Sequence, residues 1–122
     1  ELASSSLVRL AFPLEPNHNH KQTAFGGNLY SAAVLAGWSV CWCALQERGI
    51  RAQVVIAGSS ERFLKAVTGD FVAECGVEAA QLDAAFKLLE RKGIARVVLQ
   101  GVVRCDGKAC VTFEGTYGLI GN

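Results

Sequence analysis

The residues best suited to acid–base chemistry lie in a polar segment, 17–23, near the start of the chain. His18 and His20 are the only histidines, and a neutral imidazole can act as a general base near pH 7. Two positions apart on an extended loop, their side chains point to opposite sides, so we expect one of them, His20, to face a site. The alternative is that both are solvated loop residues. No third ligand accompanies them, so we expect no metal site.

Gly26 and Gly27 follow this segment and stand directly before a long uncharged run. The first N–H groups of a helix are unpaired and lie at the positive end of its dipole. A helix that begins at two glycines can therefore present these groups to a carbonyl oxygen without obstruction by side chains. The alternative is that the pair only provides a tight turn into the helix. Asn28 is placed to cap the helix or to stand in its first turn.

The uncharged run from Leu29 to Leu45 predicts a helix that is buried on all sides, because a helix that is apolar all round must be enclosed. Its length of about 25 Å is short for a bilayer, so we favour enclosure by protein over a membrane span. Small residues at i,i+4 spacing would let a sheet approach closely, and two tryptophans would fill wider gaps. These are Ala32 with Ala36, Ala33 with Gly37, and Trp38 with Trp42.

The remaining chain predicts strands and one amphipathic helix. Alternation and turn residues predict strands at 7–12, 53–57 with a continuation at 62–65, 71–77, 94–105 and 108–119. Between two of them, the helical spacing at 82–89 predicts a surface helix that ends at Gly93. Ser59, Ser60 and Glu61 form a polar break, for which a solvated bend and a part in a site are the two alternatives. The pattern predicts an α+β fold in which an antiparallel sheet curls around the long apolar helix.

Composition limits the classes of partner. The net charge of +1 with interleaved acids and bases indicates neither a nucleic-acid site nor an acidic lipid surface. With 122 residues, half of them hydrophobic, we expect a single domain over 1–122, which could be one part of a longer chain. Five cysteines without CxxC spacing suggest reduced packing thiols and a cytoplasmic location. A disulfide between Cys105 and Cys110, across the Asp106-Gly107 hairpin, is the alternative for that pair.

Two motifs on either side of the long helix resemble the hotdog-fold superfamily. Asn19, Thr23 and Phe25-Gly26-Gly27 resemble the Asn-x-x-x-(Ser/Thr)-x-His-Gly-Gly signature of phenylacetyl-coenzyme-A-type thioesterases, with Phe25 in place of the histidine. The run 62–70 resembles the strand, bend and Gly-Asp turn of that superfamily. The stretch 23–31, followed by Gly37-Trp38, is similar to a narrower thioesterase branch. That branch also occurs C-terminal to an acetyltransferase domain in some bacterial proteins.

The resemblance implies hydrolysis of an acyl-coenzyme A or acyl-carrier-protein thioester, with no cofactor beyond the coenzyme A or phosphopantetheine of the substrate. The thioester carbonyl would be polarised by the N–H of Gly27 or Asn28, beside an unobstructed Gly26. Asn19 would hold the attacking water or the carbonyl, and Thr23 would fix the loop. The carboxylate that related enzymes carry seven residues after the second glycine is replaced here by Val34.

Three polar residues near position 60 are candidates to complete the site. Ser60 could orient water, Glu61 could replace the missing carboxylate, and Arg62, with Arg51 and Lys65, could meet coenzyme A phosphates. Tyr30 is interpreted as core or interface packing. The resemblance also implies a homodimer, or a dimer of dimers, with the site between subunits. The alternative function is a non-catalytic acyl-binding or dimerisation module fused to a partner domain, and the acyl length stays open.

Overall fold

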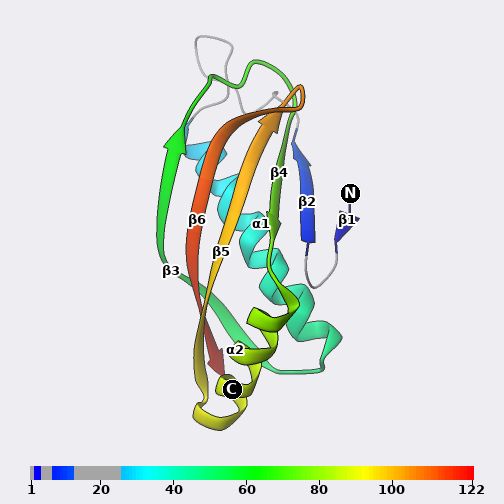
Figure 1. Cartoon of the computed structure of the whole chain (residues 1–122), viewed down its shortest axis with the longest axis vertical. Coiled ribbons are helices and arrows are strands. Elements are labelled where there is room, and N and C mark those ends of the chain that lie inside the picture. Colours follow the sequence, from blue (N-terminus) through cyan, green and yellow to red (C-terminus); the bar gives the residue numbers. More distant parts are fainter. Residues whose placement is uncertain (1, 4–6, 13–25) are drawn as a thin grey trace.

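The computed structural model describes residues 2–3, 7–12 and 26–122. In chain order the elements are β1 (Leu2–Ala3), β2 (Leu7–Phe12), α1 (Gly26–Glu47), β3 (Ala52–Phe63), β4 (Phe71–Gly76), α2 (Ala79–Lys92), β5 (Ile94–Cys105) and β6 (Lys108–Gly121). The strands form one antiparallel sheet in the order β1-β2-β4-β5-β6-β3. The sheet curves around α1, with β3 at one edge (Figure 1). The predicted α+β architecture is confirmed.

The second predicted strand differs from the expectation. The residues 59–61 are not a bend, because β3 runs unbroken from Ala52 to Phe63 and pairs with β6 along that length. The irregularity lies earlier, where the register shifts between Ile56 and Gly58. One extra residue in a strand forms a β-bulge, which changes the face that the following side chains occupy.

The β5–β6 hairpin turns at Asp106 and Gly107, as predicted. Both residues have positive φ, 53° and 75°, which is typical of the two-residue turns that match the twist of paired strands. Cys105 stands opposite Lys108 in this register, so Cys110 lies outside its reach for a disulfide. All five cysteines are free, and the interpretation as packing thiols is confirmed.

The long helix is buried on one side only, so the prediction of burial on all sides was wrong. Its inner face packs on the sheet through eight buried residues: Leu29, Ala32, Ala33, Ala36, Val40, Cys41, Ala44 and Leu45. Leu35 and Trp42 remain 46% and 45% exposed. By length and composition Leu29–Glu47 is the one described helix that could cross a membrane, and half of it is buried inside the protein. A core helix passes the same test of length and composition.

The close approach of sheet and helix predicted from the small residues occurs at Gly37. A Cβ atom there would lie 2.2 Å from the hydroxyl oxygen of Tyr117 on β6. That hydroxyl donates a hydrogen bond to the Val34 carbonyl at 2.8 Å. Burial raises the pKa of Tyr117, so its hydroxyl keeps the proton that it donates. Gly37 is therefore needed for this helix–sheet contact.

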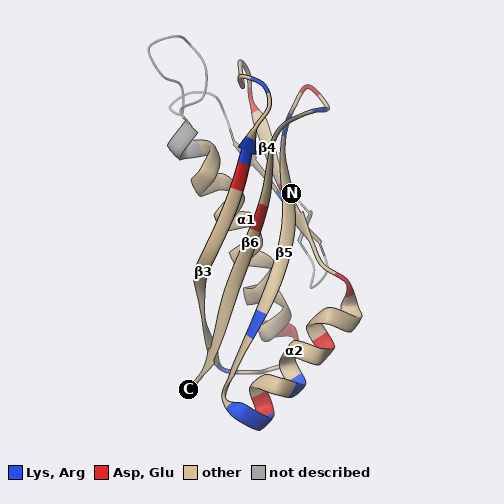
Figure 2. Cartoon of the chain, turned by 60° about the vertical axis from the view of Figure 1, so that its left-hand side comes forward, with Lys and Arg blue, Asp and Glu red and all other residues tan. Residues whose placement is uncertain are grey.

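The amphipathic α2 packs on β5 and β6 through Leu82, Ala85, Phe86 and Leu89. It ends as predicted at Gly93, which has φ of 78° and donates its N–H to the Leu89 carbonyl. Arg48, just after α1, forms an ion pair with Asp83 and lies 4.7 Å from the centre of the Phe86 ring. Charged residues gather on α2 and at the upper end of the sheet, while most of α1 carries none (Figure 2).

On the outer face of the sheet, Glu74 of β4 is held by two arginines. Its carboxylate oxygens accept hydrogen bonds from Arg9 at 2.6 Å and Arg104 at 2.9 Å. The Arg104 and Arg9 guanidinium groups hold the pKa of Glu74 below its ordinary value. This three-residue cluster links β2, β4 and β5.

Candidate functional site

An apolar groove runs between α1 and the edge strand β3. It has a volume of about 670 Å³, and its lining comes from α1, β3 and β6: Tyr30, Ser31, Val34, Leu35, Trp38, Val54, Val55, Ile56 and Tyr117. Tyr30, Val34 and Trp38 recur at i,i+4 spacing, which places them on one stripe of the helix. The groove therefore follows the helix axis beside the sheet edge.

One end of the groove lies close to the start of α1. Gly26, Gly27 and Asn28 are the first three residues of the helix, so their N–H groups have no partner within it. The two glycines thus belong to the first helical turn and do not form a turn before it. Tyr30 lies three residues after Gly27, about 4.5 Å along the axis. A carbonyl held at the helix start would have the groove beside it.

The far end of the groove is crossed by Trp38. Its indole Nε1–H donates a hydrogen bond to the Val54 carbonyl at 3.2 Å. The Trp38 ring also stacks on Trp42 at 6.0 Å between centroids. The predicted gap-filling role of the tryptophans is therefore confirmed for Trp38, whereas Trp42 is largely exposed.

The bulge in β3 decides which polar side chains face the helix. Residues directly opposite each other in paired strands share a face of the sheet. Ile56 lies opposite Tyr117, and beyond the bulge Glu61 lies opposite Phe113; both of these β6 partners are buried on the inner side. Ser60 instead lies opposite the exposed Glu114. Glu61 therefore faces inward, while Ser60 faces away from α1.

Sequence reasoning missed a polar pair at the mouth of the groove. The Ser59 hydroxyl lies 3.5 Å from the Tyr30 hydroxyl, a long hydrogen bond between β3 and the first turns of α1. Tyr30 packs against the core, as predicted, and its hydroxyl makes this contact in addition. The i,i+4 recurrence of Tyr30 with Val34 and Trp38 was the available signal, but the bulge that brings Ser59 to it leaves no clear mark in the sequence.

Glu61 has an unusual environment. Its Oε2 atom is buried and finds no hydrogen-bond partner among the described residues. A buried polar atom without a partner is costly, since desolvation is not repaid. Such atoms are expected to meet a water, a ligand or another part of the protein. Glu61 therefore presents a buried carboxylate oxygen, on the side of β3 that faces α1, that is free to accept a hydrogen bond from a water or a ligand.

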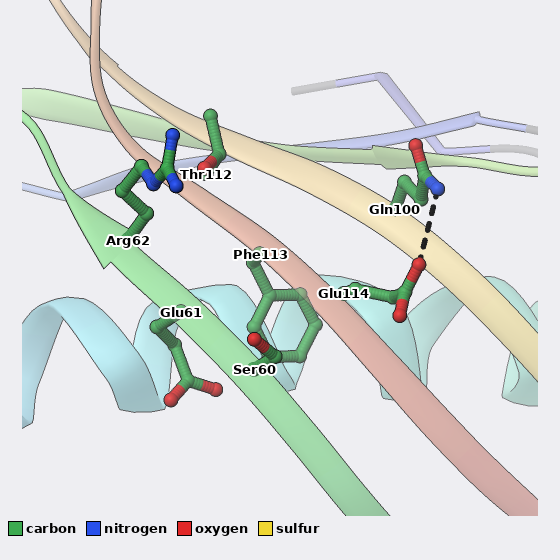
Figure 3. Close-up of a pocket in the computed structure, with 7 residues that line it drawn as sticks. All are labelled: Ser60, Glu61, Arg62, Gln100, Thr112, Phe113 and Glu114. Atoms are coloured by element: carbon green, nitrogen blue, oxygen red, sulfur yellow. Dashed lines mark hydrogen bonds between the residues drawn. The ribbon is translucent and has the colours of Figure 1, made fainter.

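A second, smaller hollow of about 290 Å³ lies across the neighbouring strands β3, β6 and β5 (Figure 3). It is lined by Ser60, Glu61, Arg62, Gln100, Thr112, Phe113 and Glu114. Gln100 donates a hydrogen bond to Glu114 at 3.2 Å. Ser60, Glu61 and Arg62 all line this hollow, and none of the three lines the apolar groove of the same chain.

The three basic residues considered for coenzyme A phosphates do not lie together. β3 runs antiparallel to α1, because it begins soon after the end of the helix and its Ser59 meets Tyr30 near the helix start. Arg62 and Lys65 therefore lie toward the helix start, while Arg51 lies at the opposite end beside Gln46 and Gly49. Arg51 is excluded from a phosphate site at the mouth of the groove.

Several predicted site residues precede α1. Asn19, His20 and Thr23 lie outside the described residues, as does His18. Val34, where related enzymes were expected to carry a carboxylate, lines the groove. Within the described ranges, no three His, Cys, Asp or Glu side chains come close enough to hold a metal ion.

Known proteins share the motifs and the fold of this chain. Residues 4–120 match the model of the YiiD_C family, which is described as "Putative thioesterase (yiiD_Cterm)". The chain belongs to this family. Its match covers almost the whole sequence, and the resemblance inferred from the glycine motif and the helix is confirmed.

Solved structures agree with the family. A protein of unknown function from Chlorobaculum tepidum TLS is 35% identical, with a TM-score of 0.92 over 96% of this chain and 78% of that chain. A structure described as a putative thioesterase from Shewanella oneidensis is 28% identical, with a TM-score of 0.88 over 98% and 81%.

A third structure extends the likeness in fold alone. A Pseudomonas aeruginosa protein described as of unknown function and "Probable Thioesterase" is 21% identical, with a TM-score of 0.87 over 100% of this chain and 81% of that chain. The chain described here by its curved sheet and long helix has the hotdog fold.

Proposed function

We propose that the protein hydrolyses an acyl-coenzyme A or acyl-carrier-protein thioester. The observation that supports this most is the apolar groove that starts beside the free N–H groups of α1. An acyl chain requires an apolar channel, and a thioester carbonyl requires hydrogen-bond donors at the head of that channel. The groove and the helix start provide both, in a family described by its thioesterase character.

In this mechanism the carbonyl oxygen accepts hydrogen bonds from the N–H groups of Gly27 and Asn28. These donors stabilise the negative charge that develops on the oxygen in the tetrahedral intermediate. Their contribution is electrostatic and is strengthened by the positive end of the helix dipole. Gly26 and Gly27 leave room for the backbone to approach the substrate.

Glu61 is the general base of the proposal. Its carboxylate takes a proton from water as the water oxygen bonds to the carbonyl carbon, and the C–S bond breaks when the intermediate collapses. The proton then passes to the leaving thiolate. Ser59 and Tyr30 at the mouth of the groove orient the water, and Asn19, His20 and Thr23 supply further contacts from the preceding segment. Arg62 and Lys65 remain available to the coenzyme phosphates.

The groove requires a second copy of the chain to close it. β3 is an edge strand that has no neighbour on its far side in the described part of the chain, and unpaired edges of this length need cover. We propose that two copies pair along β3, so that exposed Leu35 and Ile56 become buried. In such a dimer, Ser60 and Arg62 of one copy would contribute only to the site of the other copy.

A non-catalytic acyl-binding or dimerisation module is the second candidate. Val34 favours it, because an apolar residue stands where related enzymes were expected to carry the reactive carboxylate. In the segment from Asn28 to Gln46 there is no Asp or Glu to take over that role. Under this alternative the groove binds an acyl chain and no hydrolysis follows.

The deciding experiment measures thiol release from a panel of acyl-coenzyme A and acyl-carrier-protein substrates. A general base contributes about 10²–10⁴-fold, so Glu61→Gln should lower kcat at least about tenfold. Glu114→Gln is the matched control on the outer face and should leave kcat unchanged. Substrate binding without thiol release would favour the module. If Glu61→Gln releases thiol as fast as the wild type, the general base would instead lie in the 17–23 segment. Asn19→Ala and His20→Ala would test that alternative.

A further inference from the structure

We propose that the Trp38 indole, held to the Val54 carbonyl, is the end wall of the acyl groove and selects acyl chains of medium length. This inference rests on the proposed function and names the substrate class of the same site. Trp38 is thereby a specificity-determining residue.

The first step is the direction of the groove. Its polar mouth lies at Tyr30 and Ser59, next to the helix start. Its walls beyond that point come from apolar side chains of both elements, Val34 and Ile56 among them. A thioester with its carbonyl at the helix start would thus extend its acyl tail along α1 toward Trp38.

The second step is the closure at the far end. Trp38 reaches from α1 to the β3 backbone through its 3.2 Å hydrogen bond to Val54. Its ring is supported from behind by the stacked ring of Trp42. A bulky side chain that is bonded across the groove and stacked on a second ring cannot move aside without losing both contacts. The groove therefore ends at a wall that is fixed in place.

The third step is the length. Ten residues from Asn28 to Trp38 span about 15 Å of helix axis. Helical side chains lean toward the N-terminus, so the Trp38 ring lies closer to the mouth than its backbone does. With the thickness of that ring subtracted as well, the length of groove open to an acyl chain is about 12 Å. An extended chain advances about 1.3 Å per carbon, given C–C bonds of about 1.5 Å. The groove accordingly accepts acyl chains of about ten carbons.

The test is the chain-length profile of kcat/KM, from butyryl- to palmitoyl-coenzyme A. Each methylene buried in the groove should raise kcat/KM by up to about fourfold, and this gain should stop or reverse beyond decanoyl. In Trp38→Ala the gain should continue to longer chains, and Trp38→Phe, which lacks the indole donor, should lie between. Val34→Phe should stop the gain about four carbons earlier, since it stands one turn closer to the mouth. Ile94→Ala changes an exposed apolar residue outside the groove and is the control, whose chain-length profile should match the wild type.

Thermal melting shows first whether each variant is folded. If Trp38→Ala does not fold, Val34→Phe still tests the end wall. The end wall would be overturned if kcat/KM of the wild type continued to rise up to palmitoyl-coenzyme A. It would also be overturned if no variant at Trp38 or Val34 changed the acyl length at which kcat/KM stops rising. Failure to hydrolyse any substrate refutes the proposed function alone. In that case the Kd values of thioether analogues of the same lengths, in the same variants, decide the question of the wall.

Discussion

Gly37→Ala gives a direct test of the helix–sheet contact that positions the groove. The new Cβ would lie 2.2 Å from the Tyr117 hydroxyl oxygen and within 2.7 Å of two ring carbons. Tyr117 is fully buried, and a Cβ added at Gly115 would lie only 2.9 Å from its ring. The ring is therefore packed on both sides and cannot withdraw freely.

The magnitude follows from three opposing terms. Alanine gains about 1 kcal/mol over glycine in a helix interior. Overpacking of a rigid core costs about 1–3 kcal/mol, and displacement of the Tyr117 hydroxyl from the Val34 carbonyl costs about 1 kcal/mol more. We expect a net loss of about 1–3 kcal/mol in the free energy of unfolding, which corresponds to a lower Tm by about 5–10 °C.

The assay is thermal and urea unfolding of Gly37→Ala beside Gly58→Ala. The control places the same methyl group at a position with no atom within 4 Å, so its Tm should stay within about 2 °C of the wild type. Tyr117→Phe removes the hydroxyl and should relieve part of the loss when it is combined with Gly37→Ala. A Gly37→Ala protein that melts at or above the wild-type temperature would refute the reasoning.

Three further predictions concern charge and thiol chemistry. Arg104 and Arg9 lower the pKa of Glu74, so this carboxylate stabilises the fold fully above its ordinary pKa of about 4.3 and the stabilisation is lost as the pH falls through the lower folded-state pKa. In urea titrations at a series of pH values, the free energy of unfolding of Glu74→Gln should therefore fall less steeply at acid pH than that of the wild type. Burial raises the pKa of Cys41 and Cys75 to about 12, so iodoacetamide at pH 8 should modify the half-buried Cys43 first, as mass spectrometry of the native protein can verify. Arg48→Ala removes an exposed ion pair and a ring contact with α2, and should cost about 1 kcal/mol in urea unfolding; an unchanged midpoint would mean that neither contact contributes.

Most of the fold could be predicted because local signals agreed with one another. Alternation predicted β4 with its buried Phe71, Ala73 and Cys75, and turn chemistry predicted the bend at Asp106-Gly107. The exposed side of α1 could not be predicted from its own residues. Leu35 and Trp42 are as apolar as the buried residues of the helix, and burial within one chain depends on how far the sheet reaches around it.

The candidate site was harder to predict, since it depends on a single extra residue. With regular alternation from Val54 and Ile56, the next inward side chain near the mouth would be Ser60, whereas both Ser60 and Glu61 were proposed from the sequence. The bulge replaces it with Ser59 and Glu61. No residue type in 57–58 requires a bulge at that place, so the sequence alone did not reveal which polar residues face the helix.

The bulge also separates β3 into two halves whose side chains are placed by different registers. The half before it lines the apolar groove, and the half after it carries the inward-facing Ser59 and Glu61. A strand that kept residue 57 but paired without the bulge would leave the first half unchanged and shift the tip by one residue, which would exchange the inward Glu61 for inward Ser60 and Arg62. The bulge thus decides which polar side chains lie at the mouth of the groove, while the fold and the apolar lining stay the same.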